Sequence, residues 1–271
     1  MLFKILNILN NTRLKMSIIS NNTILKINSK KELGQFYTTN YNYILQNLTI
    51  PTDISTIIEP FAGKGDLLKY LTKDYTIESY DIDPKDEIII KRDTLLEPPI
   101  FENKFILTNP PYLARNKSKS KIIYDKYNEN DLYKCFIREL LKNQAIGGII
   151  IIPLNFFCSI RKKDVNLRRD FLKVYNIKQL NIFEEQVFED TKYTICSFLF
   201  MKEDYSGLIN TTIYPINKNI ILKINKDNKY QIGGELYQSK KSPYKIERLT
   251  KNNKTKPNIT NILLKCIDDS L

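Results

Sequence analysis

The chain has no histidine and no tryptophan among its 271 residues, and it has only 4 cysteines and 8 glycines. Without histidine, the protein cannot build a Ser-His-Asp or Cys-His nucleophile pair, an imidazole base or a zinc site with histidine ligands. The cysteines are far apart in the sequence, which argues against a zinc knuckle or a CxxC redox motif and favours free, buried thiols in a reducing compartment. They are Cys135, Cys158, Cys196 and Cys266.

Long apolar runs are missing as well. None reaches the roughly 18 residues that a membrane-spanning helix needs, so we expect no transmembrane segment and no membrane partner. The stretch from Met1 to Leu9 is apolar, but Lys4 and Asn7 interrupt it and no small-residue cleavage site follows. A secretory signal is therefore not expected, and we place the protein in the cytoplasm or wherever its target lies.

Positive charge is in excess. The chain carries 42 Lys and Arg against 30 Asp and Glu, which gives a formal net charge of +12. One interpretation is a lysine-rich surface from a genome of biased composition. The other is a surface that attracts phosphate groups, because each basic side chain that neutralises a phosphate releases a counterion. The densest basic cluster favours a nucleic-acid-binding role for its own segment, and it comprises Arg115, Lys117, Lys119 and Lys121.

Apolar runs alternate with helical patterns from residue 54 onward, which predicts an α/β fold with a parallel sheet and helices on both faces. The expected strands are residues 54–58, 76–80, 87–91, 104–108, 149–154, 177–183 and 193–201. One helix is expected to begin with Asp66 as its N-cap, and another is expected over residues 131–142. The pattern divides the chain into a poorly defined leader of residues 1–30, a main domain of residues 31–202 and a small, β-rich module of residues 203–271.

Acidic residues and a glycine-containing loop stand at the ends of the first predicted strands. Glu59 is followed by a loop with the sequence PFAGKGDL, in which Gly63 and Gly65 allow the backbone to approach a ligand closely. Asp81 ends the next strand, where a carboxylate can accept both hydroxyls of a ribose, and Asp93 could accept from an adenine amino group. Taken singly, each motif has a simpler alternative. The glycine loop could be a plain tight turn, and the two aspartates could be solvated turn residues.

The motif Asn109-Pro110-Pro111-Tyr112 follows another apolar strand. Its two prolines fix a rigid, extended turn and remove two N–H donors. Carbonyl oxygens and the Asn109 amide then face a cleft beside an aromatic ring. Such a site is suited to gripping a planar amide or amino group, whereas the alternative is a proline-rich turn with incidental neighbours.

Together these motifs resemble those of the S-adenosylmethionine-dependent DNA adenine-N6 methyltransferases. The segment GQFYTT precedes the glycine loop, and the glycine loop precedes NPPY, which is the order of the γ group typified by restriction-modification methylases. The resemblance implies the class I methyltransferase fold, a Rossmann-like doubly wound sheet, with a small C-terminal β-rich appendage. The matching segments are residues 34–39, 59–67, 80–84, 109–112, 130–133 and 187–192.

The resemblance implies S-adenosyl-L-methionine as the cofactor and no metal. Thr38 would bind the carboxylate of the cofactor, Asp81 would hold its ribose, and Ile82 and Asp93 would contact its adenine. The remaining cofactor-binding residues that the resemblance implies are Phe36, Tyr37, Glu59, Phe61, Gly63 and Gly65.

The resemblance also implies how a target adenine would be held. Asn109 and the Pro110 carbonyl would grip its N6 amino group, within a catalytic motif that includes Pro111. Tyr112 and Phe188 would stack on the two faces of the base after it has rotated out of duplex DNA. The basic cluster of residues 115–121 would contact the DNA backbone.

Only about 70 residues follow the main domain, which is short for the recognition domain of a γ-type enzyme. Sequence recognition could therefore depend on a homodimer or on a separate recognition subunit, and a restriction endonuclease could be a further partner. If the source is a virus, the viral factory or the nucleus replaces the cytoplasm as the expected location. Three other activities stay open: methylation of adenine in RNA, methylation of a protein glutamine at N5, and a catalytically idle DNA-binding subunit with a methylase fold.

Overall fold

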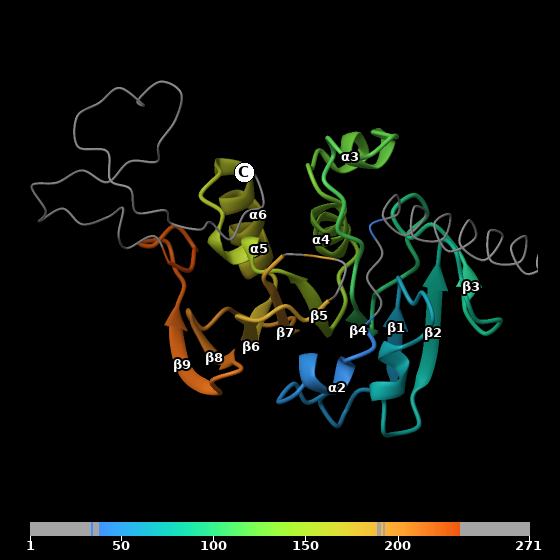
Figure 1. The fold of residues 1–271 in the computed structure, drawn as a ribbon, viewed down its shortest axis with the longest axis horizontal. Coiled ribbons are helices and arrows are strands. Elements are labelled where there is room, and N and C mark those ends of the chain that lie inside the picture. Colours follow the sequence, from blue (N-terminus) through green and yellow to red (C-terminus); the bar gives the residue numbers. More distant parts are fainter. Residues whose placement is uncertain (1–33, 35–37, 189–190, 192, 234–271) are drawn as a thin grey trace, which may run out of the picture.

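The computed structural model describes residues 34, 38–188, 191 and 193–233 (Figure 1). These residues form one nine-stranded sheet in the order β3-β2-β1-β4-β5-β7-β6-β8-β9. The strands are β1 (Thr56–Glu59), β2 (Thr76–Asp81), β3 (Ile90–Lys91), β4 (Phe105–Thr108), β5 (Gly147–Pro153), β6 (Asn176–Phe183), β7 (Ile195–Met201), β8 (Leu208–Tyr214) and β9 (Lys218–Lys223). The helices are α2 (Tyr41–Ile44), the 3-10 helix η1 (Leu67–Tyr70), α3 (Ile122–Tyr127), α4 (Leu132–Lys142), α5 (Asn155–Cys158) and α6 (Lys162–Leu172).

The strands β3, β2, β1, β4 and β5 run parallel to one another. The chain order reverses between β1 and β4, so the carboxyl ends of these two strands diverge into separate loops and leave room for a ligand. β7 inserts antiparallel between β5 and β6. The doubly wound α/β sheet that the sequence predicts is therefore present, with two antiparallel strands, β7 and β9, in its second half.

β5 is the central strand, and all seven of its residues are buried. Its sequence is a continuous apolar run because both faces of the strand are covered. Gly148 lies at the start of the strand, where an added Cβ would come within 2.7 Å of the Ile106 carbonyl oxygen and 2.8 Å of the Phe200 ring. Glycine at this position allows the neighbouring strands and the Phe200 ring to approach closely.

Helices cover both faces of the sheet, with α4, α5 and α6 on one side and α2 on the other (Figure 1). On the first side, Phe198 and Phe200 of β7 pack against Phe171 of α6 at ring-centroid distances of 6.0 and 5.4 Å. Ser197 alternates with them and points the other way, where its hydroxyl donates to the Ile44 carbonyl oxygen of α2 at 2.5 Å. The apolar alternation of one strand thus builds two layers of core.

The described part of the C-terminal region continues the sheet. β8 pairs in parallel with β6, with Leu180 opposite Thr211, and β9 pairs antiparallel with β8. Both strands lie in the segment that the sequence assigns to a separate small module. The expected leader and residues 234–271 lie outside the described residues.

One local prediction is wrong. The helix expected from Asp66 is only the four-residue η1, which ends where Leu71 takes an extended conformation. Asp66 makes no side-chain cap, because its own backbone is helical, with φ −62° and ψ −37°. An N-cap residue normally has an extended backbone that aims its side chain at the first free N–H groups.

Two expectations from composition can be compared with the described residues. No helix among them is long and apolar enough to span a membrane. Cys135, Cys158 and Cys196 are free thiols, and burial raises the pKa of Cys135 to about 12 and that of Cys158 to about 11. Neither group is therefore an activated nucleophile at neutral pH.

Candidate functional site

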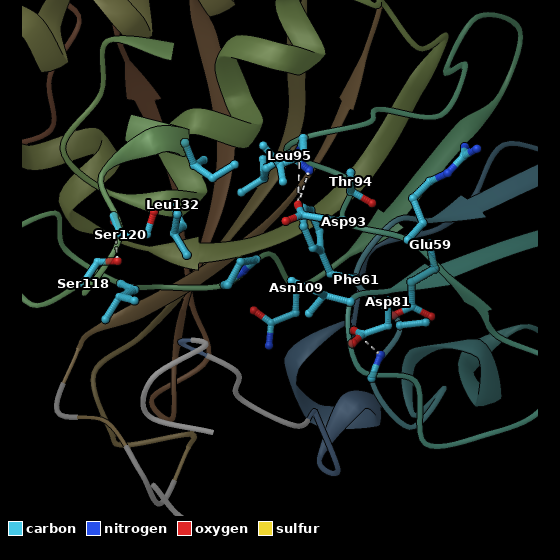
Figure 2. Close-up of a pocket in the computed structure, with 18 of the residues that line it drawn as sticks. Glu59, Phe61, Asp81, Asp93, Thr94, Leu95, Asn109, Ser118, Ser120 and Leu132 are labelled. Carbon is cyan, nitrogen blue, oxygen red and sulfur yellow. Dashed lines mark hydrogen bonds between the residues drawn. The ribbon is translucent and has the colours of Figure 1, made fainter. Parts of the chain in front are cut away.

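One cavity of about 440 Å³ lies beyond the carboxyl ends of β1, β2 and β4. Glu59 ends β1, Asp81 ends β2, and Asn109 directly follows β4. All three side chains line the cavity, as Figure 2 shows. The sequence predicts a ligand site at this edge of the sheet, and the cavity lies next to the point where the strand order reverses.

Glu59 is the most deeply buried acidic group of the cavity, with an exposed fraction of 1%. Its Oε2 atom is buried and has no hydrogen-bond partner among the described residues. Burial raises the pKa of Glu59 well above its usual value, and the nearby carboxylates of Asp81 and Asp66 raise it further. A buried carboxylate oxygen without a donor is costly, so this position is suited to receive a ligand that donates hydrogen bonds or carries positive charge.

Asp81 is held in place by the glycine loop. The Gly63 N–H donates to Asp81 Oδ2 and the Asp83 N–H donates to Asp81 Oδ1, both at 2.8 Å. Burial raises the pKa of Asp81, while these two donors act in the opposite direction. The carboxylate is thus fixed in orientation at the cavity wall, beside an Ile82 side chain that is 40% exposed.

Asp93 also faces the cavity and is fixed by its own turn (Figure 2). Its Oδ1 atom accepts from the N–H groups of Leu95 and Leu96 at 3.0 and 3.1 Å. Thr94 anchors the same turn to the glycine loop by donating to the Pro60 carbonyl oxygen at 2.7 Å. Leu96 and Ile82 add exposed apolar surface around this carboxylate. Such a wall is suited to a flat, apolar ring with a polar edge.

The Asn109 amide is held by two hydroxyl groups. Its Nδ2 atom donates to Thr38 Oγ1 at 3.0 Å, and its Oδ1 atom accepts from the Tyr112 hydroxyl. The Tyr112 hydroxyl also lies 2.8 Å from the Ile151 carbonyl oxygen of β5. Tyr112 is only 4% exposed, and its ring does not line the cavity. Stacking of a base on this ring would therefore need Tyr112 to turn toward the cavity.

Gly34 joins the N-terminal motif to the NPPY loop. The Tyr112 N–H donates to the Gly34 carbonyl oxygen at 3.0 Å. Gly34 has a φ of +67°, and an added Cβ would lie 2.7 Å from the Tyr112 carbonyl oxygen. Only glycine fits both the backbone conformation and this close approach. Gly34 and Thr38 both contact the NPPY loop, which their positions in the sequence alone did not reveal.

Asp131 fastens the chain that follows Tyr112 to the start of α4. Its Oδ1 atom accepts from the Leu113 N–H at 3.2 Å, and the Leu132 N–H donates to the Leu113 carbonyl oxygen at 3.2 Å. Burial raises the pKa of Asp131 to about 6, although the nearby Lys134 and backbone donors lower it. The sequence identified residues 130–133 by resemblance but gave them no role.

The basic cluster has a different arrangement from a simple cationic surface. Arg115 forms an ion pair with Asp125, and the Lys121 ammonium donates to the carbonyl oxygens of Arg115 and Ser118. Lys117 and Lys119 line the cavity instead. DNA contact by these four residues stays a prediction, and two of them already stabilise the conformation of their own segment.

The remaining predicted residues divide into three groups. Phe61, Gly63 and Pro111 line the cavity. Gly65 and Pro110 belong to the two loops but are not among its described lining residues, and Phe188 is buried away from it. Phe36 and Tyr37 lie outside the described residues.

Several lining residues were missed by sequence reasoning. Asp66 was interpreted as a helix cap, and Leu132 was placed only in the helix expected over residues 131–142. Leu95 and Leu96 follow Asp93 by two and three residues, which is the one local signal that could have identified them. The residues missed are Ala62, Asp66, Leu67, Arg92, Thr94, Leu95, Leu96, Leu113, Ser118, Ser120, Ile122, Ile123, Tyr124 and Leu132.

Comparisons with solved structures place the chain in a fold class. A modification subunit of a type I restriction enzyme from Vibrio vulnificus YJ016 superposes with a TM-score of 0.52 at 13% identity, over 80% of this chain and 55% of that one. A structure of the DrdV–DNA complex superposes with a TM-score of 0.53 at 16% identity, over 76% of this chain and 32% of that one. The fold is that of the class I S-adenosylmethionine-dependent methyltransferases, as predicted.

The family comparison agrees with the fold. The model of the Eco57I restriction-modification methylase family matches residues 62–188, which contain the glycine loop, Asp81, Asp93 and NPPY. The resemblance to restriction-modification methylases is therefore confirmed. A comparison with curated protein sequences gave no match. The chain spans about half the length of the type I structures that it resembles, 55% of the first and 49% of another.

Proposed function

We propose that the protein transfers a methyl group from S-adenosylmethionine to N6 of an adenine that has rotated out of duplex DNA. The observation that carries the proposal is the single cavity that holds Glu59, Asp81 and Asp93 on one side and Asn109 on the other. The match to a restriction-modification methylase family supports methyl transfer in general. The adenine specificity rests on the NPPY motif at the cavity wall.

The residues present fit the proposed cofactor. The orphaned Oε2 atom of Glu59 suits the ammonium of the methionine part, because an ammonium offers three N–H donors. The fixed carboxylate of Asp81 suits the two ribose hydroxyls. Asp93, with the exposed side chains of Ile82 and Leu96, suits the adenine ring and its amino group.

When bound, S-adenosylmethionine supplies an electrophilic methyl group on a positively charged sulfur atom. The task of the chain is to prepare the amino nitrogen, whose lone pair is delocalised into the adenine ring. Asn109 Oδ1, at the cavity wall, and the Pro110 carbonyl oxygen of the same loop would be the two acceptors that hold both amino protons and favour a pyramidal nitrogen. Catalysis then depends on positioning and electrostatics, and no histidine base is required because the proton can leave to water after transfer.

Asn109 is already oriented for this task on one side. Thr38 accepts from its Nδ2 atom, which leaves Oδ1 as the acceptor end of the amide. In the structure the Tyr112 hydroxyl occupies this acceptor. Entry of the target base would displace the hydroxyl and allow the Tyr112 ring to turn and stack on the base.

DNA is the proposed substrate because the net charge of +12 favours a polyanion. Methyl transfer to RNA adenine remains the second candidate, since the same pocket would accept a single-stranded base. The chain covers about half of the type I modification subunit that it resembles, 55% of that chain. We therefore propose that a second copy or a separate recognition subunit selects the DNA sequence.

The test is to incubate the purified chain with tritiated S-adenosylmethionine and, in parallel, duplex DNA, RNA or total protein. The variant Asn109→Ala removes the proposed acceptor, and Asn166→Ala on α6 is the matched control, because Asn166 does not line this cavity. We expect label in DNA with the wild type and the control, and none with Asn109→Ala. Label found only in RNA, or only in protein, would show that this molecule and not DNA is the substrate. Absence of transfer together with absence of cofactor binding would contradict the proposal.

A further inference from the structure

Asp66 faces the cavity and has no structural task that explains its burial. It directly follows the glycine loop, it is 9% exposed, and it makes no helix cap. Its Oδ1 atom pairs with Lys69 Nζ at 2.8 Å, but Lys69 is itself largely exposed. The Oδ2 atom is buried and has no hydrogen-bond partner among the described residues. A carboxylate that only had to hold Lys69 would not need to point an oxygen into the interior.

Glu59 provides the second, independent observation. Only 1% of Glu59 is exposed, and the residue lines the same cavity. Its Oε2 atom likewise has no hydrogen-bond partner among the described residues. The two carboxylates are close enough for the charge of Asp66 to act on Glu59. Two ionised carboxylates at one place repel each other and lack donors, so a ligand that brings a positive charge and several N–H donors stabilises the ionised pair.

The chemistry of the donors selects the kind of cation. The described residues contain no group of three or more acidic or cysteine side chains placed to hold a metal ion. A primary ammonium needs fewer oxygens than a metal, and its three N–H donors can reach two carboxylates at once.

We propose that Asp66 is a binding residue for the ammonium of the cofactor's amino-acid part, where it acts together with Glu59. The inference rests on the proposed function, and it adds a residue to which the resemblance assigns no role. The exposed Lys69 orients Asp66 through its contact with Oδ1, which leaves Oδ2 for the ligand. Glu59 and Asp66 would thus bind the ammonium, whereas Asp81 and Asp93 would bind the nucleoside part.

The test compares two ligands that differ only in the ammonium. S-adenosylhomocysteine has it, and 5′-(3-carboxypropylthio)-5′-deoxyadenosine lacks it. Binding of each is measured by calorimetry to the wild type, to Asp66→Asn and to Asp66→Ser. Asp74→Asn is the matched control, because it removes the same charge from an exposed position outside the cavity. Thermal unfolding of each free variant shows that the fold is retained.

We expect Asp66→Asn and Asp66→Ser to weaken S-adenosylhomocysteine about tenfold, because each loses one charge-assisted hydrogen bond. The ligand without the ammonium should bind both variants within about twofold of the wild type. Removing the ammonium from the ligand and the carboxylate from the protein should therefore have non-additive effects on affinity. Equal weakening of both ligands, or no weakening of either, would overturn the role of Asp66. If the wild type binds neither these ligands nor S-adenosylmethionine, the proposed function itself fails.

Discussion

Four acidic side chains face one cavity, and their surroundings give them different properties. Asp81 and Asp93 accept backbone N–H groups, which fixes their orientation. Glu59 and Asp66 each keep a buried oxygen without a partner among the described residues. The first pair is therefore prepared for neutral hydroxyl and amino groups, and the second pair for positive charge.

Glu59 leads to a prediction on pH. Burial and the neighbouring carboxylates raise its pKa well above the usual value, so the free protein tends to hold a proton there. A bound cation favours the ionised form, so affinity for S-adenosylmethionine should rise with pH until the pKa of Glu59 in the free protein is passed, and binding below that pH should release a proton. Calorimetry in buffers of different ionisation enthalpy measures both quantities.

The matched variant for this prediction is Glu59→Gln, which keeps the shape and removes the titration. We expect its affinity to be lower than that of the wild type at high pH and to vary little with pH. If the variant shows the same rise with pH as the wild type, another group is responsible.

Tyr112 allows its hydroxyl and its ring to be tested separately. The hydroxyl contacts Asn109 Oδ1 and lies 2.8 Å from the Ile151 carbonyl oxygen, so it competes with the target amino group for the Asn109 acceptor. Tyr112→Phe should free this acceptor and keep the stacking ring, so we expect its kcat to stay within about tenfold of the wild type. Tyr112→Ala should lose about a hundredfold. Single-turnover methyl transfer measures both, and a phenylalanine variant as inactive as the alanine variant would contradict this account.

At the scale of elements, the NPPY loop is held by neighbours rather than by its own sequence. Gly34 accepts from Tyr112, and Asp131 at the start of α4 accepts from Leu113. The two contacts lie on either side of the motif's last residue, from segments that are distant in sequence. Contacts of this kind limit the movement of the loop that carries the Asn109 acceptor. Catalysis tolerates only small displacements of such a group.

We predict that Asp131→Ala lowers kcat about tenfold and leaves the affinity for the cofactor within about twofold, because the carboxylate holds the loop and does not line the cavity. Asp131→Asn should restore most of the loss, since it keeps an acceptor oxygen. The wild-type pKa of about 6 adds a check in pH: kcat should change little across this value, because a protonated carboxyl, like the asparagine amide, keeps an acceptor oxygen for the Leu113 N–H. Lys134 is the charged neighbour that opposes protonation. A loss confined to cofactor affinity would exclude a positioning role.

Much of the element pattern could be predicted from the sequence. The expected strands near β1, β2, β4, β5, β6 and β7 are present, because most are rich in apolar and β-branched residues and are bounded by turn residues. The length of η1 could not be predicted, since Leu67–Tyr70 has good helix formers and the chain turns extended at Leu71 to reach β2. The pairing of β8 with β6 could not be predicted either, because it depends on partners about 30 residues apart.

The candidate site divides in the same way. Glu59, Asp81, Asp93 and Asn109 could be predicted, because each stands at or just beyond a strand end and parallel strands share that edge. The conformation of Tyr112 could not, because it depends on the distant Ile151 carbonyl oxygen. Two contacts of the basic cluster could not be predicted either. They are the ion pair of Arg115 with Asp125 and the hydrogen bond from Lys121 to the Arg115 carbonyl oxygen.

At the scale of the whole molecule, Arg168 of α6 connects the end of the sheet to the layer of helices. It is fully buried, and its guanidinium donates to the carbonyl oxygens of Phe156, Ser159 and Tyr230 at 2.7, 2.8 and 2.5 Å. Phe156 belongs to α5, and Tyr230 follows β9. One side chain therefore joins β9 and its following turn to the helices that cover β5 and β7.

We predict that Arg168→Met lowers the free energy of unfolding by at least about 3 kcal/mol, because three buried carbonyl oxygens lose a charged donor. Urea unfolding followed by circular dichroism gives this value. Arg169→Met, at the neighbouring and partly exposed position, is the control and should change it by less than about 1 kcal/mol. Equal stability of the Arg168 variant and the wild type would show that these contacts contribute little.

The central claim is that Asn109 prepares the N6 amino group of a DNA adenine. It is tested most directly by incubating duplex DNA with S-adenosylmethionine and the wild type or Asn109→Ala, digesting the DNA to nucleosides and identifying the methylated species by mass spectrometry. The account predicts N6-methyl-2′-deoxyadenosine with the wild type and at least about a hundredfold less with Asn109→Ala. Methylation at a cytosine, or an Asn109→Ala variant as active as the wild type, would contradict it.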